Sequence, residues 1–162
     1  MNKILYHIYL FFFATHILAT VCLDMQALPI VGSLYPTVLK DLLHFYITTF
    51  KDPLMSKQPP FLQSFIIAEA IFQLPFFFVV LYALIKKKNW IRIPSIFYGS
   101  HTATTVWAIL YEFALSKEIN TNTKLVLISL YYPYFLIPLI LAIHMSLVEV
   151  PFPNKQKATK SN

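Results

Sequence analysis

The chain has 162 residues, of which 57% are hydrophobic and only 12% are charged. Soluble domains carry about 25% charged residues, so this composition excludes an ordinary soluble domain and indicates one compact integral membrane domain. The net charge of +6 does not indicate nucleic-acid binding, since the basic residues lie between apolar segments and are not interleaved with exposed aromatic residues. The single cysteine, Cys22, excludes an intrachain disulfide and a cluster of metal-binding thiolates.

Four apolar segments are long enough to cross a bilayer, which requires about 20 mostly apolar residues. They span residues 4–24, 61–85, 91–115 and 125–147. The first lacks a small-x-small cleavage site, and its apolar part exceeds the usual signal-peptide core of about 7–15 residues, so we expect an uncleaved helix. The chain is therefore predicted to be all-α, with a four-transmembrane-helix bundle over residues 1–148 as its single domain and a basic tail over residues 149–162.

The connection between the first two segments contains the pattern of a further helix. Apolar residues fall on one stripe between Pro36 and Phe50, and Pro36 suits a helix start. Lys51-Asp52-Pro53 ends the pattern because proline disfavours a helical conformation in the residue before it. We expect a short luminal amphipathic helix that lies on the membrane interface or covers the end of the bundle.

The distribution of Lys and Arg predicts the orientation. Four spans place both termini on one side, and that side carries eight basic residues against five on the other. The eight are Lys3, Lys86, Lys87, Lys88, Arg92, Lys155, Lys157 and Lys160, and the five are Lys40, Lys51, Lys57, Lys117 and Lys124. By the positive-inside rule, both termini are predicted to be cytoplasmic.

The second span contains one ionisable residue, Glu69, about 12 Å along the helix. An ionised carboxylate at that depth costs at least a few kcal/mol, so it must be protonated, paired or hydrated. Gln73 lies one turn later on the same face, and Pro75 is predicted to kink the helix because it lacks a backbone donor. These features favour a pocket, although Glu69 bonded to a neighbouring helix as a structural polar group is the alternative.

A second acid, Asp24, belongs to the same half of the predicted bundle. His16, Thr20 and Asp24 form one polar stripe if the first helix continues through Asp24, whereas otherwise Asp24 only marks the membrane exit. Two carboxyl groups close together in a low-dielectric site share a proton, because two adjacent charges are costly there. Such a pair can hold a cation, with aromatic residues such as Tyr134 and Phe45 beside it, or can transfer protons to and from an apolar substrate.

The sequence predicts neither a metal site nor a cofactor. Histidines 7, 16, 101 and 144 are scattered over three predicted helices, which does not match the spacing of metal ligands. The chain also lacks a glycine-rich phosphate loop, a nucleophile elbow, an HExxH motif and an EF-hand loop.

Several short motifs carry a family resemblance over residues 4–148. They are Leu23-Asp24-Met25-Gln26-Ala27, Leu34-Tyr35-Pro36, Phe50-Lys51-Asp52-Pro53-Leu54, Glu69–Phe77, Trp90-Ile91-Arg92, His101–Thr105, Tyr131–Tyr134 and Leu136–Pro138. In this order and spacing they resemble the sigma-2 receptor family within the EXPERA superfamily, which also contains a sterol Δ8–Δ7 isomerase.

The resemblance implies a pocket in the luminal half of the bundle that opens sideways to membrane lipid. It implies that Asp24 forms an ion pair with a ligand amine and that Glu69 is its protonated, hydrogen-bonded partner. The further residues expected at the ligand are Gln73, Thr105, Tyr134, Tyr46 and, from the polar stripe, His16. Asp52 and Pro75 are expected to be structural.

The resemblance also implies a function. The implied protein is a receptor of the endoplasmic-reticulum membrane, with the nuclear envelope or endolysosomal membranes as further locations. It is expected to bind sterols or oxysterols and lipophilic cationic amines, and to modulate cholesterol homeostasis. A homodimer and the Niemann–Pick cholesterol transporter are the implied protein partners. The chain has no lysine at the fourth or fifth position from its end, so a dilysine retrieval signal is incomplete.

Two other functions remain open. One is a sterol isomerase that uses the Asp24–Glu69 pair as proton donor and acceptor. The isomerases are expected to use a His and two Glu with a nearby Trp, and His101 and Glu112 are separated by about three turns. The other is a chaperone-like partner of a larger transporter, with the pocket as a regulatory site.

Overall fold

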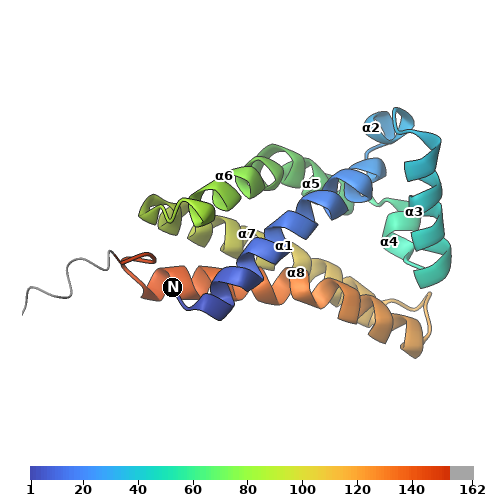
Figure 1. Ribbon diagram of the computed structural model, residues 1–162. Helices are drawn as coiled ribbons and strands as arrows, with labels where there is room; N and C mark the ends of the chain where they lie inside the picture. The colour runs from blue at the N-terminus through green and yellow to red at the C-terminus, as the bar shows by residue number, and fades with distance from the viewer. Residues whose placement is uncertain (154–162) are drawn as a thin grey trace, which may run out of the picture.

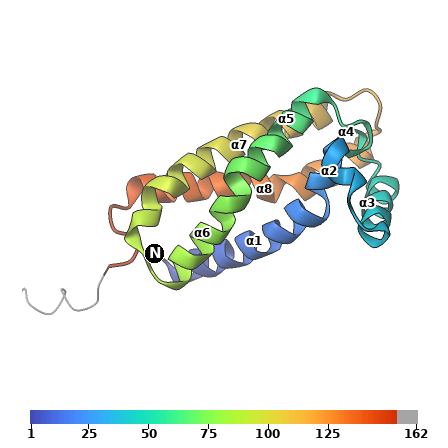
Figure 2. The same cartoon turned by 90° about the horizontal axis from the view of Figure 1, so that it is seen from above.

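The computed structural model describes residues 1–153, and within that range it contains helices and no strand. Four long helical segments form a bundle, in which the second segment is divided between α5 and α6 (Figures 1 and 2). They are α1 (Lys3–Cys22), α5 (Pro60–Ala68) with α6 (Leu74–Ile85), α7 (Arg92–Leu115) and α8 (Thr121–Leu147). The all-α bundle is as predicted.

Three of the predicted spans are both long and apolar enough to cross a membrane. They are Lys3–Ala27, Pro60–Ile85 and Thr121–Leu147. The fourth, α7, has 24 residues but is more polar, and its polar residues Ser95 and Thr102 are turned into the protein interior. Inward-facing hydroxyls are common at interfaces between membrane helices. The packing of α7 is therefore compatible with a membrane crossing, which stays a prediction.

Helices α7 and α8 pack closely because α7 carries a glycine at the contact. A Cβ atom at Gly99 would lie 2.4 Å from the carbonyl oxygen of Pro138 and 2.9 Å from the Cβ of Ala142. Small residues allow two helix backbones to approach in this way. The two helices therefore form a closely packed wall along one side of the bundle.

Three shorter helices form a cap at one end of the bundle. They are α2 (Pro29–Ser33), α3 (Thr37–Phe50) and α4 (Pro53–Lys57). Helix α3 lies across the bundle end (Figure 1), which agrees with the predicted helix between Pro36 and Phe50. Lys51 ends α3 in a left-handed conformation with φ of 54°, and Asp52 then begins α4 as its N-cap.

Asp52 holds the cap onto the bundle. Its Oδ1 accepts hydrogen bonds from the backbone amides of Leu54 (2.9 Å) and Met55 (3.1 Å). Its Oδ2 accepts from the hydroxyls of Tyr46 on α3 and Tyr131 on α8, both at 2.9 Å. Burial, and then the negative charge of Asp52, raise the pKa of the Tyr46 hydroxyl, so this group remains a protonated donor. One fully buried carboxylate thus joins α3, α4 and α8.

The second span is not one regular helix. Between α5 and α6 the backbone forms a π-helical turn, η2 (Glu69–Gln73), and the amide of Leu74 donates to the carbonyl of Glu69. Pro75 follows in the first turn of α6, where its missing amide is tolerated. The sequence predicted a kink at Pro75 and did not predict the π-turn before it.

Both described ends of the chain meet at the end of the bundle opposite the cap. The amino group of Met1 donates to the carbonyl of Pro151, and Asn89 exchanges two hydrogen bonds with the backbone of Phe152. Residues 149–153 of the predicted tail are thus described, and two of them, Pro151 and Phe152, contact this end of the bundle. The rest of the predicted basic tail, residues 154–162, lies outside the described residues.

Candidate functional site

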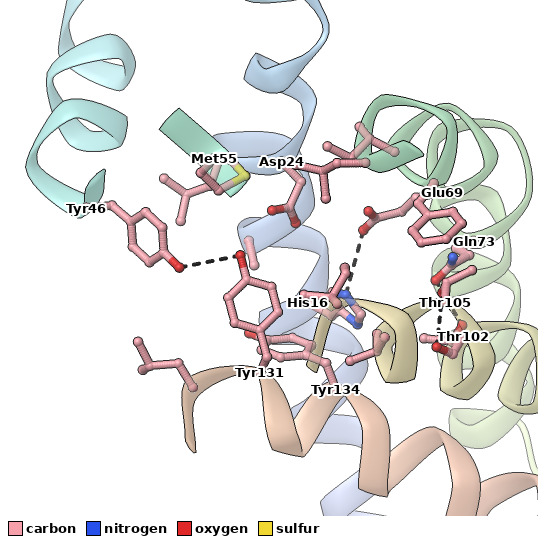
Figure 3. Close-up of a pocket in the computed structure, with 18 residues that line it drawn as sticks. His16, Asp24, Tyr46, Met55, Glu69, Gln73, Thr102, Thr105, Tyr131 and Tyr134 are labelled. Atoms are coloured by element: carbon pink, nitrogen blue, oxygen red, sulfur yellow. Dashed lines mark hydrogen bonds and ion pairs between the residues drawn. The ribbon is translucent and has the colours of Figure 1, made fainter. Parts of the chain in front are cut away.

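A cavity of about 200 Å³ lies inside the cap end of the bundle (Figure 3). All seven residues that the sequence assigned to a ligand line this cavity. They are His16, Asp24, Tyr46, Glu69, Gln73, Thr105 and Tyr134. Phe45, also expected near the ligand, is 61% exposed on the outer face of the cap and does not line the cavity.

Glu69 lies in the π-turn and is held by two residues of α1. The hydroxyl of Thr20 donates to Oε1 of Glu69 at 2.5 Å, and Nε2 of His16 lies 3.7 Å from the same oxygen. Thr20 is completely buried. Glu69 is therefore bonded to a neighbouring helix, as the alternative interpretation predicted, and it also lines the cavity.

Asp24 faces Glu69 across the cavity (Figure 3). Helix α1 ends at Cys22, so the stripe does not continue as an α-helix, and Asp24 instead opens a 3₁₀ turn, η1 (Asp24–Ala27). This turn still directs the carboxylate inward. Within residues 1–153, no side chain or backbone amide donates a hydrogen bond to the Asp24 carboxylate.

Gln26 fixes the turn that carries Asp24. Its side-chain amide donates to the carbonyl of Cys22 at 2.6 Å and to the carbonyl of Leu39 on α3 at 2.9 Å. The residue is 5% exposed, so these bonds link the end of α1 to the cap away from water. Sequence reasoning did not single out Gln26, although it belongs to the motif that contains Asp24.

His16 is packed between aromatic rings. Its imidazole stacks on Phe77, with ring centroids 4.6 Å apart, and meets Tyr134 edge-on at 4.7 Å. This packing fixes the ring beside Glu69. Tyr134 continues the aromatic wall into the cavity, where a ring face can contact a ligand cation.

Gln73 and Thr105 reach the cavity from opposite helices, but most of their hydrogen-bonding groups are engaged. Oε1 of Gln73 accepts from the Thr102 hydroxyl at 2.9 Å, and the Thr105 hydroxyl donates to the backbone carbonyl of Thr102 at 3.0 Å. Tyr131, which the sequence did not assign to the ligand, also lines the cavity next to Tyr46. Its hydroxyl is bound to Asp52, so it belongs to both the cavity wall and the cap.

The chemistry of the cavity is that of an apolar chamber with two acids. Most of the remaining wall consists of aliphatic and aromatic side chains, namely Ala19, Leu23, Met55, Leu62, Phe65, Ile66, Val106, Ile109 and Leu130. In the described part of the chain, no three His, Cys, Asp or Glu residues are arranged to hold a metal ion. The arrangement can hold a ligand that is mostly apolar and carries one positive charge.

Comparison with known proteins gives consistent matches over most of the chain. Residues 38–145 match the family described as EXPERA (EXPanded EBP superfamily). Sigma intracellular receptor 2 of Xenopus tropicalis is 45% identical over 152 residues, covering 88% of this chain and 88% of that protein. The Homo sapiens protein of the same name is 39% identical over 146 residues, covering 83% of this chain and 82% of that protein.

A fungal protein is also similar. Efficient mitochondria targeting-associated protein 19 of Schizosaccharomyces pombe is 32% identical over 142 residues, covering 85% of this chain and 73% of that protein. The family match and these relatives agree with the all-helical fold and its apolar helices. The chain therefore belongs to the EXPERA superfamily, as its motifs predicted, and is similar to the sigma intracellular receptor 2 proteins within it.

Proposed function

We propose that this protein is a non-enzymatic receptor of the endoplasmic-reticulum membrane that binds sterols and lipophilic cationic amines in the acidic cavity. Both termini face the cytoplasm, and ligand binding modulates cholesterol homeostasis and trafficking. The word receptor in the names of two relatives supports the first part of this proposal. The family resemblance supports the endoplasmic-reticulum location and the sterol role.

The observation that carries the proposal is the difference between the two acids. Glu69 already accepts a hydrogen bond from Thr20 and lies beside His16, whereas the Asp24 carboxylate faces the cavity without a donor from residues 1–153. A carboxylate in an apolar chamber is costly unless a cation neutralises it. Asp24 is therefore the counter-ion for a ligand amine, and a protonated Glu69 supports it.

The apolar wall selects the rest of the ligand. The aromatic ring of Tyr134 lies next to the acids and adds a cation–π contact, while the aliphatic residues accept a hydrocarbon body. The cavity of about 200 Å³ is smaller than the roughly 300–1,000 Å³ of a typical drug-sized site. A larger ligand therefore places its charged end here and extends toward the lipid.

Partners beyond the ligand follow from the family resemblance. We propose that the receptor acts with a cholesterol transporter of the Niemann–Pick type and that two copies associate as a homodimer. Surrounding membrane lipid supplies the ligand from the side of the bundle. Co-purification of the transporter, with and without added sterol, tests the first of these partners.

The experiment that tests the proposal compares two ligands that have the same shape and differ only in charge. Imipramine, a lipophilic tertiary amine, and an analogue with a neutral carbon in place of the amine are titrated against the purified protein. Asp24→Asn is expected to weaken imipramine binding about 10- to 100-fold, because a hydrogen bond to a charged group contributes about 1.5–3 kcal/mol. The neutral analogue is expected to lose little affinity.

Two further variants serve as controls. Glu69→Gln keeps the shape and a donor, so a protonated Glu69 predicts less than about a fivefold change in imipramine affinity. Asp41→Asn removes an exposed acid on α3 and is expected to change nothing. Imipramine binding that is unchanged in a folded Asp24→Asn protein would contradict the counter-ion role.

A sterol isomerase is the second candidate, and one observation favours it. His16, Asp24 and Glu69 line one cavity, so a base and two acids are available to move protons on a double bond. His101 and Glu112, which are about three turns apart in the sequence, do not line it, and Glu112 is exposed. Rescue of a yeast strain that lacks sterol Δ8–Δ7 isomerase, abolished by Glu69→Gln, would establish the isomerase instead.

A further inference from the structure

The Asp24 carboxylate is held in place only through its own backbone. Within residues 1–153 it accepts no hydrogen bond, whereas Glu69 is fixed by the hydroxyl of Thr20. The strength of a charged hydrogen bond depends on its distance and angle, so an ion pair with a ligand requires a carboxylate in a defined position. The residues that fix the turn of Asp24 therefore determine where a ligand cation can lie.

Gln26 ties this turn to two helices without lining the cavity. It follows Asp24 by two residues in η1 and is 5% exposed. Its side-chain amide donates both to the carbonyl of Cys22, the last residue of α1, and to the carbonyl of Leu39, in the first turn of α3. The end of a helix leaves carbonyls such as that of Cys22 without a partner inside the helix. Both donors of the amide therefore hold the turn between α1 and α3.

A second contact fixes the backbone of Gln26. Helix α2 packs against the turn at Gly32, where a Cβ atom would lie 2.4 Å from the carbonyl oxygen of Gln26 and 3.2 Å from its carbonyl carbon. A side chain at position 32 would displace the turn, because the atoms that it meets belong to the backbone. Met25, Gln26 and Ala27 are all buried, so the turn has little space into which it can move.

We propose that Gln26 is a positioning residue for the ligand cation. Together with Gly32 it holds the turn that directs Asp24 into the cavity, and it thereby sets the preference of the cavity for a charged ligand over a neutral ligand of the same shape. This inference rests on the proposed function, in which Asp24 is the counter-ion of a ligand amine. Because Gln26 does not line the cavity, it acts through Asp24.

The test is a double-mutant cycle on the full-length protein, with imipramine and its neutral carbon analogue as the two probes. Gln26→Met keeps the length of the side chain and removes both donors. It is expected to weaken imipramine binding about 5- to 10-fold, a part of the loss of about 10- to 100-fold expected for Asp24→Asn. The affinity for the neutral analogue is expected to change less than about twofold. In an Asp24→Asn background, Gln26→Met is expected to cause no further loss, because the two residues act as one unit.

Gln63→Met is the matched control for Gln26→Met. The side-chain amide of Gln63 also donates to a backbone carbonyl, that of Gln58 at 2.7 Å, and Gln63 does not line the cavity. The substitution removes a comparable hydrogen bond elsewhere in the fold. It is expected to leave the ratio of the two ligand affinities unchanged.

A pair of glycine variants tests the same turn from α2. Gly32→Ala is expected to lower the preference for imipramine over the neutral analogue, as Gln26→Met does. Gly99→Ala is its control, because its added Cβ would also lie 2.4 Å from a backbone carbonyl oxygen, that of Pro138, in a contact of α7 and α8 that does not line the cavity. Gly99→Ala is expected to keep the wild-type ratio of affinities. Equal losses of both ligands in Gly32→Ala would exclude Gly32 from the positioning role.

The outcomes for Gln26→Met and Asp24→Asn separate the two proposals. A Gln26→Met protein that loses both ligands equally or completely would show that Gln26 only supports the fold. A further loss of imipramine affinity when Gln26→Met is added to Asp24→Asn would show that Gln26 does not act through Asp24. An unchanged ratio in Gln26→Met beside a large loss in Asp24→Asn would overturn the positioning role and leave the proposed function intact. Imipramine binding that is unchanged in Asp24→Asn would overturn both.

Discussion

Thr20 stabilises one of the two acids of the cavity, Glu69, through a buried hydrogen bond. Its hydroxyl lies 2.5 Å from Glu69, and the side chain is completely buried between α1 and the π-turn. Thr20→Val preserves the shape and removes the donor, so it leaves a buried carboxyl oxygen with a poorer partner. We expect the free energy of unfolding to fall by about 1–3 kcal/mol.

The midpoint of thermal unfolding, followed by the fluorescence of Trp90 and Trp107, measures this effect. Thr15→Val is the matched control, because Thr15 lies on the same helix and its hydroxyl bonds only to backbone carbonyls of its own helix. Equal shifts in the two variants would show that the Thr20–Glu69 hydrogen bond does not stabilise the fold.

The sequence predicted the residues of the cavity better than their contacts. Depth in an apolar segment identified Glu69, and four-residue spacing placed His16 and Asp24 on the same side. The role of Gln26 was not predictable, since its side chain bonds to the carbonyl of Leu39 on α3, beyond the intervening turn and α2. Tyr131 was missed for a similar reason, because its hydroxyl bonds to Asp52 in the cap.

At the scale of elements, the cap depends on one carboxylate. Asp52→Ala removes the N-cap of α4 and leaves the hydroxyls of Tyr46 and Tyr131 without their acceptor. An N-cap contributes about 1 kcal/mol, and unpaired buried hydroxyls cost more, so we expect a loss of about 2–5 kcal/mol in the free energy of unfolding. Because Tyr46 and Met55 also line the cavity, ligand dissociation is expected to accelerate.

Thermal unfolding and the dissociation rate of tritiated imipramine check the two expectations. Asp41→Ala is the control, since Asp41 is an exposed acid on α3. If Asp52→Ala resembles Asp41→Ala in both measurements, the cap is held by apolar packing and not by the carboxylate.

The π-turn between α5 and α6 is a feature that the sequence pattern does not predict. A helix with 3.6 residues per turn predicts which residues share a face, and over residues 61–85 nearly every residue is apolar, so the pattern carries little information about a local change of register. Pro75 predicted a kink, whereas the structure has a π-turn in the residues just before it. The tertiary contacts of Glu69 with Thr20 and of Gln73 with Thr102 accompany the turn.

At the scale of the whole molecule, the two ends of the bundle differ in structure. One end brings the N-terminus, Asn89 and Phe152 together, while the cap covers the acidic cavity at the other. The even number of long helical segments predicted from the sequence agrees with termini that meet at one end. The distribution of Lys and Arg residues predicts which end faces the cytoplasm.

The orientation can be measured in sealed microsomes with a membrane-impermeant maleimide. In a Cys22→Ser background, Lys3→Cys and Lys86→Cys place an exposed thiol at the end that holds the N-terminus, and Lys117→Cys and Asn122→Cys place one at the cap end. The basic residues divide eight to five in favour of the first end, so the positive-inside rule predicts that only Lys3→Cys and Lys86→Cys react before detergent is added.

Detergent is expected to expose the other two sites to the reagent and provides the control for their accessibility. Labelling of Lys117→Cys or Asn122→Cys in sealed vesicles, with Lys3→Cys and Lys86→Cys protected, would reverse the orientation and place the acidic cavity in the cytoplasmic half. Labelling of only one of Lys3→Cys and Lys86→Cys before detergent is added would contradict two membrane crossings between these residues. Labelling of Lys117→Cys together with Lys86→Cys before detergent is added would show that α7, the most polar of the long helices, does not span the membrane.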